Sequence, residues 1–375
     1  MEQNMWKSLI KPQPMFDVLE AANAREKSGS YVARMEIGDT SGFINKSIHE
    51  YVKKNSNCEF RYSASPGEPE LIDIVHQTQW KSFSTKYYGV SIAPANFLIT
   101  AALASVSKPG EIVMLPDPGF PTYTLSTNFL MLSPIYYEID ELLLGGQEYI
   151  DQLLGEDVSR ACAIIINNPN NPTGIAKSGE LFKDLIENFE KSKIRVIIDE
   201  TYINLIYDST SPFIECQSAI RIRSFSKEHC APGLRTGYAL APNAESKVIS
   251  DFISLTISCA PKFIQISIAQ YLASSKANIF VASVKQKMNS RFAYVATALS
   301  NETLIGKPNS TFYVCVKVQD SNLAFNKLLE NNVSTCPGIK FGPRGQNYLR
   351  ISLAGRESNF AKDLEMLKIG LNSIH

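Results

Sequence analysis

The sequence predicts an α/β fold, in which a mostly parallel sheet lies between helices, together with a smaller α+β part. In the middle of the chain, short apolar runs typical of buried strands alternate with segments of helical spacing such as 178–192, and the pattern turns mainly helical after Val248. The apolar runs are 111–115, 161–166, 194–198, 219–224 and 238–241. Sheets of this kind bind ligands at the carboxyl ends of their strands, where the loops converge.

The smaller part is predicted from both ends of the chain. The first forty residues contain a helix at 15–27 and then an extended stretch to Gly38. The C-terminal pattern predicts a long helix at 277–299 and two strands at 311–318 and 348–353. It also predicts two further helices, at 321–331 and 358–374. We therefore expect a large domain at 45–275 and a small domain formed by 1–44 and 276–375.

Composition narrows the class of protein. At 375 residues the chain is too long for one small core, and its 37 Lys and Arg residues balance 37 Asp and Glu residues, so no long-range field favours nucleic acid or a membrane. The start has no apolar run of signal-peptide length, and no later stretch reaches about 18 uncharged apolar residues. Seven scattered cysteines without a C-x-x-C pair disfavour disulfides and a zinc site. We expect a soluble, cytoplasmic protein with no metal and no nucleic-acid or membrane partner.

A carboxylate is expected at the tip of a buried strand, because the apolar run 194–198 ends at Asp199. There it can hold a pyridine nitrogen protonated, and a protonated ring lets a cofactor accept electrons. Tyr202, in the following turn, can reach the phenolic oxygen of the same ring. The alternatives are that Asp199 caps a helix or turn and that Tyr202 is a core aromatic.

Asn171 follows the run 161–166 in a rigid turn. Pro169 and Pro172 fix the backbone φ angle and Gly174 allows a positive φ, so the side chain of Asn171 is held as a donor in a preset direction. An ordinary Asx/Pro turn is the alternative interpretation.

Lys227 follows the run 219–224, and Arg235 lies shortly after it. The amine of a lysine becomes nucleophilic near a cation and in a partly desolvated site, where it can form a Schiff base with an aldehyde. Arg235 and the hydroxyl groups of Ser224 and Ser226 are suitable phosphate ligands, the arginine through its bidentate fork. Taken alone, Lys227 or Arg235 could equally be a solvated surface residue. The spacing of the pair favours a Schiff-base lysine with a phosphate ligand beside it.

These strings have the order and spacing of a known family. With NNPNNPTG (167–174), DETY (199–202) and SFSK (224–227), the chain resembles the class I/II pyridoxal-phosphate aminotransferases of the fold type I superfamily. The resemblance covers nearly the whole chain. It implies a large domain whose mostly parallel, seven-stranded sheet lies between helices, and a smaller α+β domain.

The resemblance also implies a role for each residue of these strings. Lys227 corresponds to the catalytic Schiff-base lysine and Asp199 to the aspartate on the pyridine nitrogen. Asn171 and the catalytic Tyr202 correspond to the residues bonded to the cofactor O3′ oxygen. The phosphate ligands correspond to Ser224, Ser226 and Arg235.

Four further correspondences are weaker. Phe120 resembles the aromatic residue that stacks on the cofactor ring, and Tyr62 resembles the tyrosine that reaches the phosphate of the neighbouring subunit, which implies a homodimer with shared active sites. Arg350 resembles the arginine that grips the substrate α-carboxylate through two hydrogen bonds. Gly38 would add a backbone N–H donor near that carboxylate. The side chain of Asn171 would also contact the substrate.

Two segments depart from the family pattern. The family's Ser/Thr-Gly-Ala cradle holds phosphate on backbone N–H groups at a helix N-terminus, and no glycine is present here. The favoured register places Ile92 and Ala93 in the cradle and starts the helix near Pro94, whereas the rival register at 100–102 leaves too short a helix. The loop 39–43 replaces a Pro-containing loop, so the substrate-side wall is expected to be altered.

The function implied is that of an aminotransferase that uses pyridoxal 5′-phosphate. It would move an amino group from an amino acid to a 2-oxo acid by a ping-pong mechanism through a Schiff base on Lys227. The alternative enzyme performs another reaction at the amino acid α- or β-carbon, as a lyase, decarboxylase, cyclase or oxidase. A non-catalytic member of the fold is disfavoured by the joint presence of Lys227, Asp199, Asn171 and Arg350. The sequence does not identify the donor or the acceptor.

Overall fold

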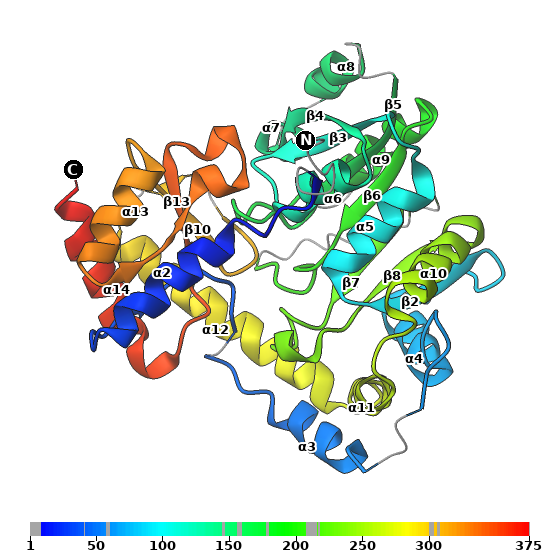
Figure 1. Cartoon of the computed structure of the whole chain (residues 1–375), viewed down its shortest axis with the longest axis horizontal. Helices are drawn as coiled ribbons and strands as arrows, with labels where there is room; N and C mark the ends of the chain where they lie inside the picture. Colours follow the sequence, from blue (N-terminus) through cyan, green and yellow to red (C-terminus); the bar gives the residue numbers. More distant parts are fainter. Residues whose placement is uncertain are drawn as a thin grey trace, which may run out of the picture.

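The structure of the protein is a computed structural model. It describes residues 9–40, 42–57, 61–144, 147–155, 160–177, 180–207, 216, 218–299, 304–305 and 308–374. A larger unit surrounds a seven-stranded sheet, and a smaller unit beside it includes helix α2 (Met15–Lys27) and the C-terminal helix α14 (Glu357–Asn372) (Figure 1). The domain boundaries at 44/45 and 275/276 stay a prediction.

The larger unit is built on a sheet with the strand order β2-β8-β7-β6-β5-β3-β4. Strands β3 to β7 pair in parallel, whereas β8 runs antiparallel to both β2 and β7. The strands are β2 (Tyr88–Ala93), β3 (Ile112–Asp117), β4 (Ser133–Glu138), β5 (Ala161–Asn167), β6 (Arg195–Asp199), β7 (Ile220–Ser224) and β8 (Gly237–Pro242). The mostly parallel, seven-stranded sheet is therefore confirmed, and the carboxyl ends of its parallel strands meet at one edge.

Both faces of this sheet are buried, which explains why its strands read as continuous apolar runs. Because successive side chains point to opposite faces, Ile164 and Ile166 pack in the same core as α9 (Glu180–Lys191), and Ile165 packs in the core of α5 (Ala95–Val106). The larger unit also contains α3 (Lys46–Asn55), α4 (Pro69–Gln79), α6 (Thr122–Phe129), α7 (Ile139–Leu144), α8 (Gln147–Gly155), α10 (Asn243–Ile257), α11 (Lys262–Leu272) and the 3-10 helix η2 (Pro232–Leu234).

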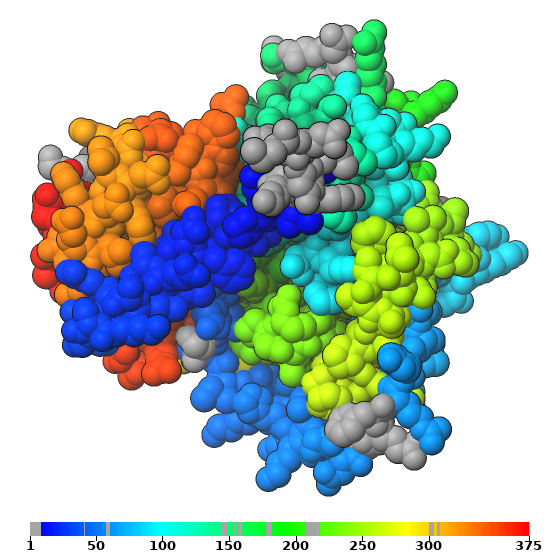
Figure 2. Space-filling model, viewed as in Figure 1, coloured from blue at the N-terminus to red at the C-terminus, as the bar shows by residue number. Residues whose placement is uncertain are grey.

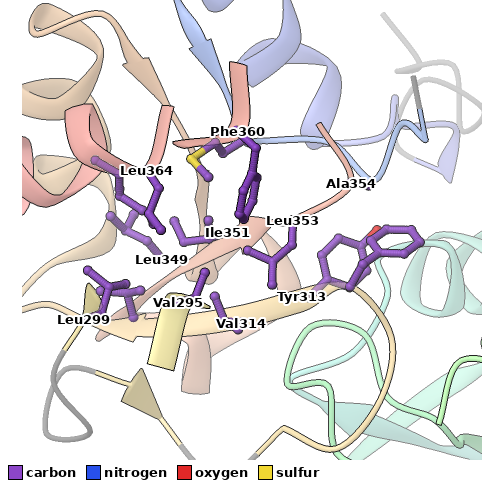
Figure 3. Packing of buried hydrophobic residues seen from close by; sticks show 14 of the residues in the cluster. Val295, Leu299, Tyr313, Val314, Leu349, Ile351, Leu353, Ala354, Phe360 and Leu364 are labelled. Atoms are coloured by element: carbon purple, nitrogen blue, oxygen red, sulfur yellow. The ribbon is translucent and has the colours of Figure 1, made fainter. Parts of the chain in front are cut away.

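The smaller unit contains an antiparallel sheet in the order β12-β13-β10-β9 and a short parallel pair, β1 with β11. Its core joins Val314, Leu349 and Ile351 of the sheet to Phe360 and Leu364 of α14 (Figure 3). The elements besides α2 and α14 are β1 (Ala33–Arg34), β9 (Leu304–Ile305), β10 (Tyr313–Lys317), β11 (Val333–Ser334), β12 (Cys336–Pro337), β13 (Tyr348–Ser352), α12 (Lys276–Ala298), α13 (Ser321–Glu330), η3 (Gly338–Phe341) and η4 (Pro343–Gly345).

The N-terminal segment lies across the junction of the two units. Ala33 of β1 pairs with Val333 of β11, which adds this segment to the smaller unit. The residues before α2 reach the larger unit, where Gln13 Nε2 donates to Thr122 Oγ1 at 2.8 Å. Figure 2 shows α2 lying along the surface between the two units. The segment therefore covers one side of the place where the units meet.

Other features of the described residues concern thiols, metals and membranes. The six described cysteines are free, and Cys58 lies outside the described residues. No group of three His, Cys, Asp or Glu side chains in the described part of the chain is arranged to hold a metal ion. No described helix is both long and apolar enough to cross a lipid bilayer.

A buried ion network lies beside Asp199 in the sheet. The carboxylate of Glu200 pairs with Arg221 and with Arg223, whose Nε lies 2.8 Å from Glu200 Oε2. Burial by itself raises the pKa of Glu200, but the two arginines outweigh burial and hold this pKa below its usual value. Glu200→Gln removes the carboxylate that these two buried arginines share, so we expect the free energy of unfolding, measured by urea titration, to fall by about 3–5 kcal/mol.

The pH dependence of this effect has a definite sign. A lowered pKa in the folded state means that the carboxylate of Glu200 stabilises the fold above the unfolded value of 4.5 and that this contribution is lost as the pH falls through the folded pKa. The difference in stability between the natural protein and Glu200→Gln should therefore shrink in acid. A difference that stays constant down to low pH would contradict the interpretation.

Candidate active site

A cavity of about 320 Å³ opens at the carboxyl ends of the parallel strands, where the two units meet. Residues from both units line it. The predicted site residues that it brings together are Gly38, Phe120, Asn171, Asp199, Tyr202, Ser224, Ser226, Lys227, Arg235 and Arg350.

Lys227 lies in the turn that follows β7, and its side chain enters the cavity. Nζ donates to the carbonyl oxygen of Gly38 at 2.8 Å and lies 5.9 Å from the centre of the Phe312 ring. A Cβ atom at position 38 would lie 1.8 Å from the Tyr313 hydroxyl, so only glycine allows the backbone to lie this close to Tyr313. Gly38 thus contacts the lysine through its carbonyl, and the role of its N–H as a substrate donor stays a prediction.

Asp199 ends strand β6 within the cavity wall. One carboxylate oxygen accepts hydrogen bonds from the N–H and the hydroxyl of Thr201, at 3.0 and 2.6 Å, and the other accepts from the Tyr123 hydroxyl at 2.7 Å. Burial raises the pKa of Asp199, and these hydrogen bonds offset the rise only in part. No cation among the described residues pairs with this carboxylate, so a cationic group on a ligand would complete the site.

Tyr202 lies in the turn after β6 and is fully buried. Its hydroxyl is 3.2 Å from the hydroxyl of Tyr313, and the two rings meet edge to face with centroids 5.8 Å apart. Burial, together with the nearby Tyr313, raises the pKa of Tyr202 well above its usual value. The phenol therefore keeps its proton at neutral pH and can donate it to a ligand oxygen.

Arg350 of β13 is buried against the turn that carries Asn171. Its Nη1 donates to Asn171 Oδ1 at 2.9 Å and its Nη2 to the Glu36 carbonyl at 2.6 Å. The guanidinium carbon lies 4.1 Å from the Tyr313 ring centre and 4.7 Å from that of Phe341. Nε has no hydrogen-bond partner among the described residues, so the guanidinium keeps donors for a carboxylate ligand.

The groups predicted to bind phosphate gather at the N-terminus of α5. Ser224 and Ser226 line the cavity there, and Arg235 Nη2 donates to Oδ1 of Asn96, in the first helical turn, at 3.4 Å. Arg235 has a left-handed backbone, φ +49°, directly after η2. Two hydroxyls, a guanidinium and free helical N–H groups form a suitable surface for a phosphate dianion.

The predicted cradle residues need a correction. Helix α5 begins at Ala95 with Pro94 at its N-cap, as the favoured register requires. However, Ile92 and Ala93 do not line the cavity, because they end strand β2 and their side chains are buried in apolar cores. The cavity is lined instead by Ala95 and Asn96, whose N–H groups lie in the first turn and have no intrahelical partner.

Tyr62, predicted to reach the site of the neighbouring subunit, also lies outside the cavity of its own chain. It is 85% exposed and lies beside Arg61, Pro261 and Lys262 in a separate surface hollow. A tyrosine in that position is available to a second copy of the chain. Phe120, by contrast, lines the cavity, with its ring 5.9 Å from that of Tyr123.

Several residues in or beside the cavity were missed by sequence reasoning. Tyr123, which does not itself line the cavity, stands in the same DPGFPTY string as Phe120, but its hydrogen bond to Asp199 joins α6 to the end of β6 and leaves no local signal. Tyr313 lies in a predicted strand, where an aromatic residue is normally interpreted as part of the hydrophobic core. Gln13 and Asn96 are single polar residues. The place of Gln13 depends on how the N-terminal segment reaches the larger unit, and the place of Asn96 depends on where α5 begins.

Comparisons with known proteins agree with this arrangement. The family Aminotransferase class I and II matches residues 90–364. The chain is 27% identical to the aspartate aminotransferase of Pyrococcus horikoshii, over 97% of this chain and 95% of that one. It is 26% identical to the (5-formylfuran-3-yl)methyl phosphate transaminase of Methanocaldococcus jannaschii, over 96% of both. The aspartate aminotransferase from Thermus thermophilus with maleate superposes with a TM-score of 0.89 over 99% of both chains at 20% identity, which shows a shared fold.

The fold and the cavity define a fold type I enzyme that uses pyridoxal phosphate. The match over 90–364 assigns the chain more narrowly: it belongs to the class I and II aminotransferases. It is therefore a pyridoxal-phosphate-dependent aminotransferase, and relatives of it are named aspartate aminotransferase.

Proposed function

We propose that Lys227 carries the cofactor and that the other cavity residues bind the cofactor and the amino acid substrate. The observation that carries the proposal is that the Lys227 amine shares one cavity with a buried carboxylate that lacks a cation, Asp199, and an arginine with spare donors, Arg350. Pyridoxal phosphate, when bound, supplies an aldehyde and an electron-accepting ring. Its phosphate is held by Ser224, Ser226, Arg235 and the N–H groups at the start of α5.

Each residue then has a defined task at a stated atom. Lys227 Nζ would hold the aldehyde carbon of the cofactor, and as a free amine it would accept the proton from the substrate α-carbon. Asp199 holds positive charge on the ring nitrogen, and the hydroxyl of Tyr202 and the amide of Asn171 donate to the ring oxygen. Arg350 holds the α-carboxylate and so orients the α-carbon.

We further propose a homodimer in which Tyr62 of one subunit completes the site of its partner. Exposure of Tyr62 beside Arg61 and Lys262, away from the cavity of its own chain, supports this arrangement. A protein that sediments only as a monomer while fully active would contradict it. The cytoplasmic location stays a prediction.

The reaction is tested with a panel of amino acids. We expect a preferred donor to be converted to its 2-oxo acid with consumption of one equivalent of 2-oxoglutarate or another acceptor, and with ping-pong kinetics. Aspartate belongs in the panel because relatives are named for it, and neutral donors belong there because Arg350 offers this chain one carboxylate site. Release of ammonia, carbon dioxide or a cyclic product without use of the acceptor would instead indicate the lyase, decarboxylase, cyclase or oxidase alternative.

A further inference from the structure

A row of buried polar side chains lies directly behind the turn of Lys227. Glu228 and His229, the next residues along the chain, are 1% and 4% exposed, and neither is among the residues that line the cavity. The task of cofactor and substrate binding therefore leaves both without a role. With their hydrogen-bond partners they form what we call the buried polar chain, which consists of Asn204, Glu228, His229, Tyr271 and Asn45.

The members of the buried polar chain contact one another in order. Asn204 Nδ2 donates to Glu228 Oε2 at 2.6 Å, and Glu228 Oε1 lies 3.1 Å from His229 Nε2. His229 Nδ1 is 3.2 Å from the Tyr271 hydroxyl. Asn45 Nδ2 donates to that hydroxyl and also to the His229 carbonyl, both at 3.0 Å. The chain thus connects the turn after β6, the turn of Lys227, α11 and the start of α3.

The Tyr271 hydroxyl lies between two partners. Its oxygen accepts from the Asn45 amide and lies within hydrogen-bond distance of His229 Nδ1, where the tautomer of the imidazole decides which atom donates. His229 Nε2 lies within ion-pair distance of Glu228 Oε1, but the two groups are not aligned as a hydrogen bond. A buried network of this kind favours a single arrangement, and loss of one member leaves its neighbours unsatisfied.

The buried polar chain is joined to the reactive amine through two stretches of backbone. Lys227 Nζ donates a hydrogen bond to the carbonyl of Gly38, and the carbonyl of His229 accepts a hydrogen bond from the side chain of Asn45. The segment 38–45 is therefore tied at both ends to the segment 227–229. Asn45 is itself held in place because its Oδ1 caps α3, accepting from the N–H of Ile48 at 3.1 Å.

We propose that Glu228, His229 and Tyr271 are positioning residues, which set where Nζ of Lys227 lies in the cavity. The inference rests on the proposed function of Lys227. A reacting group displaced by about 1 Å can lose roughly 10²-fold in rate, so loosening the turn should slow the steps that occur at Nζ. Binding of the amino acid, which depends on Arg350, should be little affected.

The test is a single-turnover reaction of the holoenzyme with its preferred amino acid, followed by decay of the Schiff-base absorbance. For Tyr271→Phe, which removes one hydroxyl, we expect the limiting rate to fall by about 10-fold, while the half-saturating amino acid concentration changes by less than about twofold. Tyr137→Phe is the matched control, because Tyr137 is equally buried and its hydroxyl donates to the Ile165 carbonyl at 2.7 Å, on strands β4 and β5. Melting temperatures should be similar for the two variants, and the rate should fall only for Tyr271→Phe.

The outcomes separate this inference from the proposed function. A natural protein without Schiff-base absorbance after addition of pyridoxal phosphate would overturn the function of Lys227. If that absorbance is present and Tyr271→Phe reacts as fast as Tyr137→Phe, only the positioning inference is overturned. Should Tyr271→Phe fail to fold, Asn45→Ser keeps a capping oxygen for α3 but loses both donated bonds, and an unchanged rate there overturns the inference equally.

Discussion

Lys227→Ala is expected to abolish aminotransferase activity, with kcat reduced by about 10⁴-fold or more. Two functions are lost together, since the same Nζ atom binds the cofactor aldehyde and carries the substrate α-proton. Among the cations that line the described cavity, Arg235 and Arg350 remain, and a guanidinium replaces neither function because it stays protonated. The measurement is the steady-state rate with the preferred donor, together with the visible absorbance of the Schiff base, which should disappear.

Lys177→Ala is the matched control for this experiment. Lys177 is also little exposed, and burial lowers its pKa, so its amine is chemically able to react with an aldehyde. It lies outside the cavity, with Nζ 3.5 Å from the carbonyl of Leu142. Borohydride reduction followed by peptide mapping should place the pyridoxyl group on Lys227. A label on Lys177, or full activity of Lys227→Ala, would contradict the assignment.

The features that the sequence predicted well are those encoded locally. The runs 161–166, 194–198 and 219–224 became strands β5, β6 and β7, because short segments rich in isoleucine suit a sheet buried on both faces. In β7 the two buried arginines are paired with Glu200. Since parallel strands place their carboxyl ends together, Asn171, Asp199 and Lys227 were expected in one place, and all of them line the cavity.

The features that the sequence could not give depend on contacts between distant segments. The strands β1 and β11 have two residues each and exist only because they pair with one another, so no periodicity marks them. Ile92 and Ala93 were assigned to the phosphate cradle by analogy, although their apolar side chains fit the end of a buried strand equally well. The contact of Gly38 with Lys227 joins the two units, and no local pattern reports it.

Arg350→Lys is expected to weaken substrate binding strongly while leaving the cofactor in place. Arg350 is rigidly held by Asn171 and Glu36 and lies between the rings of Tyr313 and Phe341, so its remaining N–H groups have a fixed direction. A lysine at this position has no planar fork and cannot bind both oxygens of a carboxylate in the same way. With about 1.5–3 kcal/mol for each hydrogen bond to a charged group, the loss of two should lower kcat/KM by roughly 10²–10⁴-fold.

The loss should appear mainly as a higher KM for both the amino acid and the 2-oxo acid, because both carry the carboxylate, and the Schiff-base absorbance of Lys227 should persist. Arg344→Lys is a matched control, since Arg344 pairs with Glu138 on the surface at 2.7 Å and is half exposed, so its effect on KM should be negligible. A KM that rises for the amino acid alone would show that Arg350 contacts the side chain or the amine rather than the shared carboxylate. A loss of the absorbance in Arg350→Lys would show that the arginine supports the cofactor through Asn171, and the role assigned to it in substrate binding would then be wrong.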